Sequence, residues 1–327
     1  MGDFTIGRAW ALGIQFIRRS PAGHAILLIL MASVAPALIQ FALIGGATSM
    51  MSPAAFQSGA GAAALIGGGI AMIAAVIATY VLTTGGYFGS WRLGLGRDAD
   101  VGRSATYGLV AGLAVVGVFF AIGLIGFALV QVLGWVGGLL LALIILPLFI
   151  AFYSVLFAMM GIAMVVMGLF MLLFGAAAGG MNSEMGSMGA GFAGVGAIIM
   201  VPLGLLFLWL AARFCCATPA MSSRGSLNFL EAVRESWHAT APRQGRIMLY
   251  LALVGLLFGL VYLIFAGILA AAVGVTLASG GVPSMGIGTM LLTVAMGILM
   301  AYVSVLVPAG IYRAVQPDVD ASAAVFE

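Results

Sequence analysis

Residues 135–177 read WVGGLLLALIILPLFIAFYSVLFAMMGIAMVVMGLFMLLFGAA, a run that contains no charged side chain. One α-helix of this length would be about 65 Å long, roughly twice the thickness of the hydrocarbon core of a bilayer. The run therefore predicts two membrane-spanning helices joined by a tight turn near Tyr153 and Ser154. A re-entrant or interfacial arrangement of the same residues is the alternative.

The composition of the whole chain agrees with a lipid environment. Of its 327 residues, 64% are hydrophobic and 6% are charged, whereas a soluble domain carries roughly 25% charged residues. A water-soluble fold is thereby excluded. We expect an all-α integral membrane protein, organised as an interfacial helix (1–21), a transmembrane bundle (22–314) and a short tail (315–327).

Six further spans follow from the need for about 20 apolar residues per span. The prediction is a polytopic bundle of about eight helices, in which six spans are supplemented by an inserted hairpin. The spans are Ala25–Ile44, Ala62–Thr83, Tyr107–Val130, Trp135–Tyr153, Val155–Ala177, Val195–Phe214, Ile247–Val275 and Ile287–Ile311.

The arginines predict the orientation of these spans. With eight spans, all twelve arginines fall on one side of the membrane, and the opposite loops hold a single charge, Glu184. Loops rich in Arg and Lys stay in the cytoplasm. We therefore expect a bacterial inner-membrane protein that passes the membrane several times and has both termini in the cytoplasm.

The N-terminal segment predicts a helix that lies flat on the cytoplasmic leaflet. Between Phe4 and Arg19, apolar side chains recur at helical spacing and polar ones fall on the opposite side, a pattern typical of interfacial helices. The apolar stripe consists of Ile6, Trp10, Ile14 and Ile17, and the polar side holds Arg8, Gln15 and Arg19.

A second amphipathic helix is predicted near residues 228–241. Asn228 is its expected N-cap, with Glu231 in the capping-box position. Its apolar face holds Phe229, Leu230, Val233 and Trp237, and its polar face holds Glu231, Arg234, Glu235 and His238. Phe229, Val233 and Trp237 repeat the spacing of Ile6, Trp10 and Ile14, which indicates a weak internal repeat.

These two helices supply the candidate binding residues. Guanidinium groups beside an amphipathic face bind anionic headgroups or a partner protein, and a solvated helix face is the alternative interpretation. The candidate contacts are Arg8, Arg18, Arg19, Glu231, Arg234, Glu235, Trp237 and His238.

Small residues predict where helices approach closely. Gly161, Gly168 and Gly175 recur every seven residues on one helical face, and Gly255 and Gly259 form a GxxxG pattern. Both patterns are typical of packed membrane helices. Pro202 and Pro308 fall inside predicted spans, where transporters place breaks in their helices.

The order of several boundary motifs resembles a known family. Arg18-Arg19-Ser20-Pro21 is followed by Gly85-Gly86-Tyr87, the basic loop from Trp91 to Arg103, the segment Arg213 to Pro219, and Glu231 to Trp237. Together they resemble the membrane-domain family named after glycerophosphodiester phosphodiesterases and related bacterial multi-span proteins of unknown role. The resemblance implies six spans, so residues 135–177 depart from it as an apparent two-span insertion.

No catalytic, cofactor or metal-binding residue is predicted. In the resembled family, phosphodiesterase activity belongs to a separate soluble domain with metal-binding His and acidic residues. This sequence has two histidines, His24 and His238, both near the predicted cytoplasmic face and without an accompanying metal motif.

We expect a non-enzymatic protein with membrane lipids, or other membrane proteins, as partners and without nucleic acid. The sequence indicates no oligomeric state. The alternative is a permease for an apolar or amphipathic solute.

Overall fold

The computed structural model of the chain describes residues 4–50, 61–95, 100–134, 136, 138, 146, 150–151, 153–178, 184–278 and 287–316, and these are helical without strands. Their helices are α1 (Ile6–Arg18), α2 (Pro21–Ala25), η1 (Ile26–Val34), α3 (Ala35–Met50), α5 (Gly61–Gly94), α6 (Val101–Leu133), α8 (Ser154–Ala178), α9 (Glu184–Phe214), α10 (Ala217–Arg224), α11 (Phe229–Thr240), η2 (Ala241–Arg243), α12 (Gln244–Ala278) and α13 (Ile287–Val315).

Six helical segments among the described residues are long and apolar enough to cross a membrane. They are Pro21–Ala42, Gly68–Gly94, Val101–Leu133, Ile198–Arg224, Phe229–Phe265 and Leu291–Val315. The predicted span 155–177 is the single helix α8, whose described apolar part, Ser154–Leu169, is shorter than a full span. The predicted span 135–153 falls almost entirely outside the described residues, so eight spans remain a prediction.

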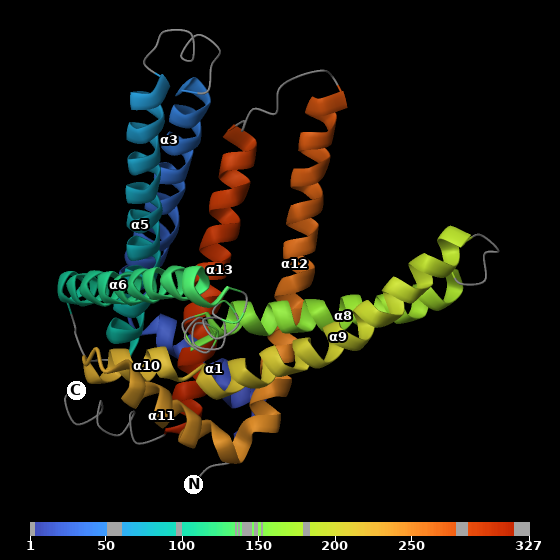
Figure 1. The fold of residues 1–327 in the computed structure, drawn as a ribbon. Coiled ribbons are helices and arrows are strands. Elements are labelled where there is room, and N and C mark those ends of the chain that lie inside the picture. Colours follow the sequence, from blue (N-terminus) through green and yellow to red (C-terminus); the bar gives the residue numbers. More distant parts are fainter. Residues whose placement is uncertain are drawn as a thin grey trace.

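The helices share one compact end, which we call the base (Figure 1). It consists of α1, α10 and α11 together with the adjoining ends of α5, α6, α9, α12 and α13. The α3–α5 and α12–α13 pairs rise from it in one direction, and the α8–α9 hairpin leans away from them (Figure 1). The arginines of the described residues all lie at the base, as do the first and last described residues, Phe4 and Gln316.

Helix α1 is docked on the end of α13 by its small residues. Its buried side is formed by Ala9, Gly13 and Phe16, and a Cβ atom at Gly13 would lie 2.9 Å from the carbonyl oxygen of Leu306. The predicted stripe of Ile6, Trp10, Ile14 and Ile17 therefore flanks the packed face rather than forming it. Glycine and alanine form the packed face because their small size lets two helix backbones approach closely.

Helix α11 repeats the register of α1. Thr5 and Asn228 are the N-caps, and each side chain accepts a hydrogen bond from the backbone N–H three residues later. At the same offset along the chain, Ala9 and Gly13 correspond to Ala232 and Ser236, which are buried in α11. The cap predicted at Asn228 is confirmed, and the matching caps and buried faces support the internal repeat.

Glycines hold the α8–α9 hairpin together. A Cβ atom at Gly161 would lie 2.6 Å from the carbonyl oxygen of Gly204, and one at Gly168 would lie 2.8 Å from Val201. The predicted seam is confirmed at these two positions, and the surroundings of Gly175 lie outside the described residues. Gly255 approaches Ile162 of α8, whereas Gly259 has open space around it, so the GxxxG pattern contributes one contact.

Helix α5 donates side-chain hydrogen bonds to two neighbouring segments close to their prolines. Proline lacks an N–H group, so Pro36 leaves the carbonyl of Ala32 without an i+4 donor, and the Thr83 hydroxyl donates to that oxygen at 3.4 Å. On α13, the carbonyl that Pro308 leaves without its helical donor is that of Ser304, and the indole N–H of Trp91 donates to the next carbonyl, that of Val305, at 3.0 Å. Helices α9 and α13 run on through Pro202 and Pro308 without a break.

Candidate headgroup-binding surface

The predicted contact residues lie on α1 and α11, where both helices face outward from the base. Arg8 and Arg18 are exposed on α1, with Arg19 at its C-cap. Leu230, Arg234 and His238, spaced four residues apart, form the exposed side of α11. Residues four apart lie on one helical face, so each helix presents cationic groups on its outer surface.

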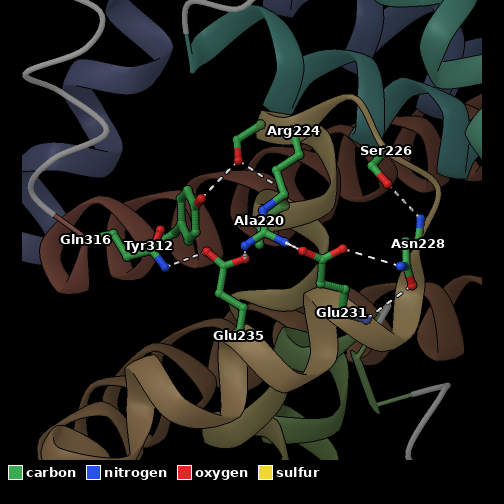
Figure 2. Close-up of polar contacts among 9 residues, drawn as sticks. Ala220, Arg224, Ser226, Asn228, Glu231, Glu235, Tyr312 and Gln316 are labelled. Carbon is green, nitrogen blue, oxygen red and sulfur yellow. Dashed lines mark hydrogen bonds and ion pairs between the residues drawn. The ribbon is translucent and has the colours of Figure 1, made fainter.

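Glu231 and Glu235 are both bound by Arg224 at the end of α10. The Arg224 guanidinium lies 2.6 Å from a Glu231 oxygen and pairs with Glu235 through its second amino group (Figure 2). The ion-pair partner of both carboxylates thus lies on another helix, which the sequence did not indicate. Both remain candidate contacts, but each is already engaged in an ion pair, and Glu231 stays exposed.

The same network ties α10 and α11 to the end of α13. Gln316 donates to Glu235 at 2.6 Å, and the hydroxyls of Tyr312 and Ser223 lie 2.9 Å apart (Figure 2). On the other side, the Asn228 amide donates to Glu231 at 3.3 Å. The network fixes the outer face of α11 relative to the bundle.

Trp237 is a packing residue and not a surface contact. Its ring lies 5.5 Å from that of Trp209 and 5.7 Å from that of Phe214, and the Arg213 guanidinium stacks 4.6 Å from its centre. The Arg213 side chain also donates to the Trp237 carbonyl at 3.2 Å. A helical pattern cannot distinguish an indole that faces lipid from one that faces a neighbouring helix.

Several arginines are structural donors that the sequence did not reveal. Arg213 and Arg243 reach carbonyls in the last turns of α11 and α13, where helix oxygens lack helical partners. Arg246 donates to Phe4 at 3.1 Å. Arg313, with 2% of its surface exposed, donates to Leu12 at 3.1 Å and reaches Gln15. An arginine in the last turn of a span is the signal that could have indicated this role.

Four of the predicted contact residues are exposed and have no partner among the described residues. Within the part of the chain that the structure describes, the side chains of Arg8, Arg18, Arg234 and His238 make no ion pair or hydrogen bond. Two apolar side chains accompany them, Trp10 at 37% exposure and Leu230 at 79%. Guanidinium groups bind phosphate oxygens through paired hydrogen bonds, and apolar side chains beside them insert below the headgroups.

Among the described residues, no group of three or more His, Cys, Asp or Glu side chains could hold a metal ion. His24, which the sequence placed near the cytoplasmic face, is buried beneath α1. Its Nδ1 atom lies 2.6 Å from the Ser90 hydroxyl, and its ring lies 4.9 Å from Phe16. This arrangement is that of a hydrogen-bonded core histidine.

Comparison of the chain with protein-family models, with curated proteins and with solved structures finds no match. The resemblance to the membrane-domain family therefore stays a prediction from boundary motifs. The class supported by the fold is a multi-pass helical membrane protein.

Proposed function

We propose that the protein is a non-enzymatic bacterial inner-membrane protein whose base binds anionic lipid headgroups on the cytoplasmic leaflet. The observation that carries this proposal is the pair of outward faces on α1 and α11, with unpartnered cations beside Trp10 and Leu230. Through these lipids, it organises the surrounding bilayer or neighbouring membrane proteins. Both termini lie in the cytoplasm with the base, because arginine-rich ends are retained there.

Among the described residues, one group of arginines is bound to backbone carbonyls and another is exposed without a partner, and this difference supports the function. Arg213, Arg246 and Arg313 are occupied by backbone carbonyls, so their charges serve the fold. The side chains of Arg8, Arg18 and Arg234 do not bind backbone carbonyls among the described residues. Each cation near an anionic lipid surface contributes about 1 kcal/mol of attraction to it. Three of them give a selectivity for anionic lipid that a purely structural base would lack.

The permease alternative has less support. Helices α9 and α13 continue through Pro202 and Pro308, whereas substrate sites in many transporters are formed by interrupted helices. Near Pro308, the Val305 carbonyl accepts a hydrogen bond from Trp91 and is therefore not available to a solute.

Lipid selectivity in nanodiscs tests the proposal. Phosphatidylcholine discs with increasing phosphatidylglycerol content report the affinity for the anionic lipid through native mass spectrometry or spin-labelled lipid. We expect Arg234→Gln to lower that affinity about fivefold, since one surface cation is worth about 1 kcal/mol.

The matched control is Arg234→Lys, which retains a positive charge at the same position on α11. It should leave the affinity nearly unchanged. Equal affinity for both lipids in the wild-type protein, or equal losses in the two variants, would contradict the proposal.

A further inference from the structure

A cluster of hydroxyl groups lies inside the membrane-spanning part of the molecule. Tyr80, Thr84 and Tyr87 occupy one face of α5, because residues four and three apart are neighbours on a helix. Tyr153, just before α8, lies near this face, beside Thr84 and Tyr80. The cluster thus joins two segments that are far apart in sequence.

The cluster has a closed end and an open end. At the closed end, Tyr87 is within hydrogen-bonding reach of Ser304 on α13. At the open end, Tyr80 has 51% of its surface exposed and no hydrogen bond within the described residues. Thr84 is 4% exposed, and its hydroxyl lacks a hydrogen bond of full geometry.

The depth of Tyr80 makes its exposure unusual. It lies twelve residues from Arg92 at the base, or about 18 Å along α5 at 1.5 Å per residue. Tyrosines usually lie at the membrane interface, whereas this position is near the middle of a hydrocarbon core of roughly 30 Å. A polar group left unsatisfied in hydrocarbon is costly, so a tyrosine exposed at this depth favours a hydrogen-bonding partner that comes from the membrane.

We propose that Tyr80, Thr84 and Tyr153 form a binding site for the uncharged polar end of an amphiphile dissolved in the bilayer. Among the described residues, the side chains that converge here carry hydroxyls, without a carboxylate or guanidinium to balance a charge. They donate to and accept from hydroxyl and carbonyl groups. A diacylglycerol and a quinone both present such groups, and their acyl or isoprenoid chains remain in the lipid beside α5.

This site is separate from the cationic surface of α1 and α11. The hydroxyl site requires no anionic headgroup and lies well above the base. Its test is therefore independent of the test of the proposed function.

Photolabelling of the full chain in nanodiscs tests the site. A photoreactive diacylglycerol and a photoreactive quinone are used in separate samples, and labelled residues are located by mass spectrometry. We expect saturable labelling around Tyr80 on α5, and the probe that competes better identifies the source of the polar group. Tyr80→Phe removes one hydroxyl and should weaken labelling about fivefold, the equivalent of one hydrogen bond.

The control is Tyr262→Phe on α12, where the tyrosine has a nearly equal exposure of 53% but lies outside the hydroxyl cluster. It should leave labelling of α5 unchanged. Tyr153→Phe provides a second variant that retains the aromatic ring. Absence of saturable labelling on α5 with both probes, or equal effects of Tyr80→Phe and Tyr262→Phe, would overturn the proposal.

Discussion

Replacing Gly310 with alanine should release α1 from the bundle. A Cβ atom at this position would fall well inside the contact distance of the Ala9 carbonyl oxygen and 3.1 Å from the Gly13 nitrogen. Both are backbone atoms, so no side-chain rotation relieves the overlap and the two helices must separate. Overpacking of this kind costs about 1–3 kcal/mol, and the roughly 1 kcal/mol that alanine adds to helix stability offsets part of it.

Hydrogen exchange of the α1 amides measures this release. Because the overlap is with backbone atoms, we take the upper end of this cost, and the net loss of about 2 kcal/mol of docking free energy corresponds to roughly a 30-fold rise in the exchange rate. Gly288→Ala is the matched control, because Gly288 lies in the same helix with open space around it. If the two variants gave the same α1 exchange, the close approach of α1 to α13 would be refuted.

The remaining predictions concern other parts of the base and the orientation. Gly225 has a φ of 66° and its Cβ position is occupied by Arg92, so Gly225→Ala should lower the thermal unfolding temperature by an amount equivalent to at least about 1 kcal/mol. Trp91→Phe should cost about 1 kcal/mol of unfolding free energy, because it removes the buried hydrogen bond from the indole to the Val305 carbonyl. A cysteine at Glu184 should react with an impermeant maleimide added outside the cell, and labelling only from the cytoplasm would reverse the proposed orientation.

Elements with a strong local signal were predicted well. The apolar runs indicated long helices, and α5, α6, α9, α12 and α13 lie where the hydropathy placed spans. The Asn228 cap was also predicted, since capping depends on residues three positions apart. The number of spans could not be predicted from local signals, because residues 135–153 carry no charge or cap that marks a turn.

The candidate site was predicted only in part, because its residues depend on tertiary partners. Arg234 and His238 are exposed as expected, whereas Glu231 and Glu235 are bound by Arg224 from another helix. Amphipathic periodicity indicates which residues share a face, but not whether that face meets lipid or protein. Trp237 illustrates the ambiguity, since its apolar face packs against Arg213 and two aromatic rings.

The docking of α1 on α13 has a consequence for how the chain is made. The two partners are separated by almost the entire sequence. Arg313 of α13 donates a hydrogen bond to the carbonyl of Leu12 in α1. At a synthesis rate of 5–20 residues per second, α13 leaves the ribosome roughly 15–60 s after α1. During that interval the part of the buried side that packs on α13, Ala9 and Gly13, has no protein partner, so the nascent helix lies on the lipid surface. Ile14 and Trp10 then anchor α1 in the lipid until α13 is inserted and packs against it.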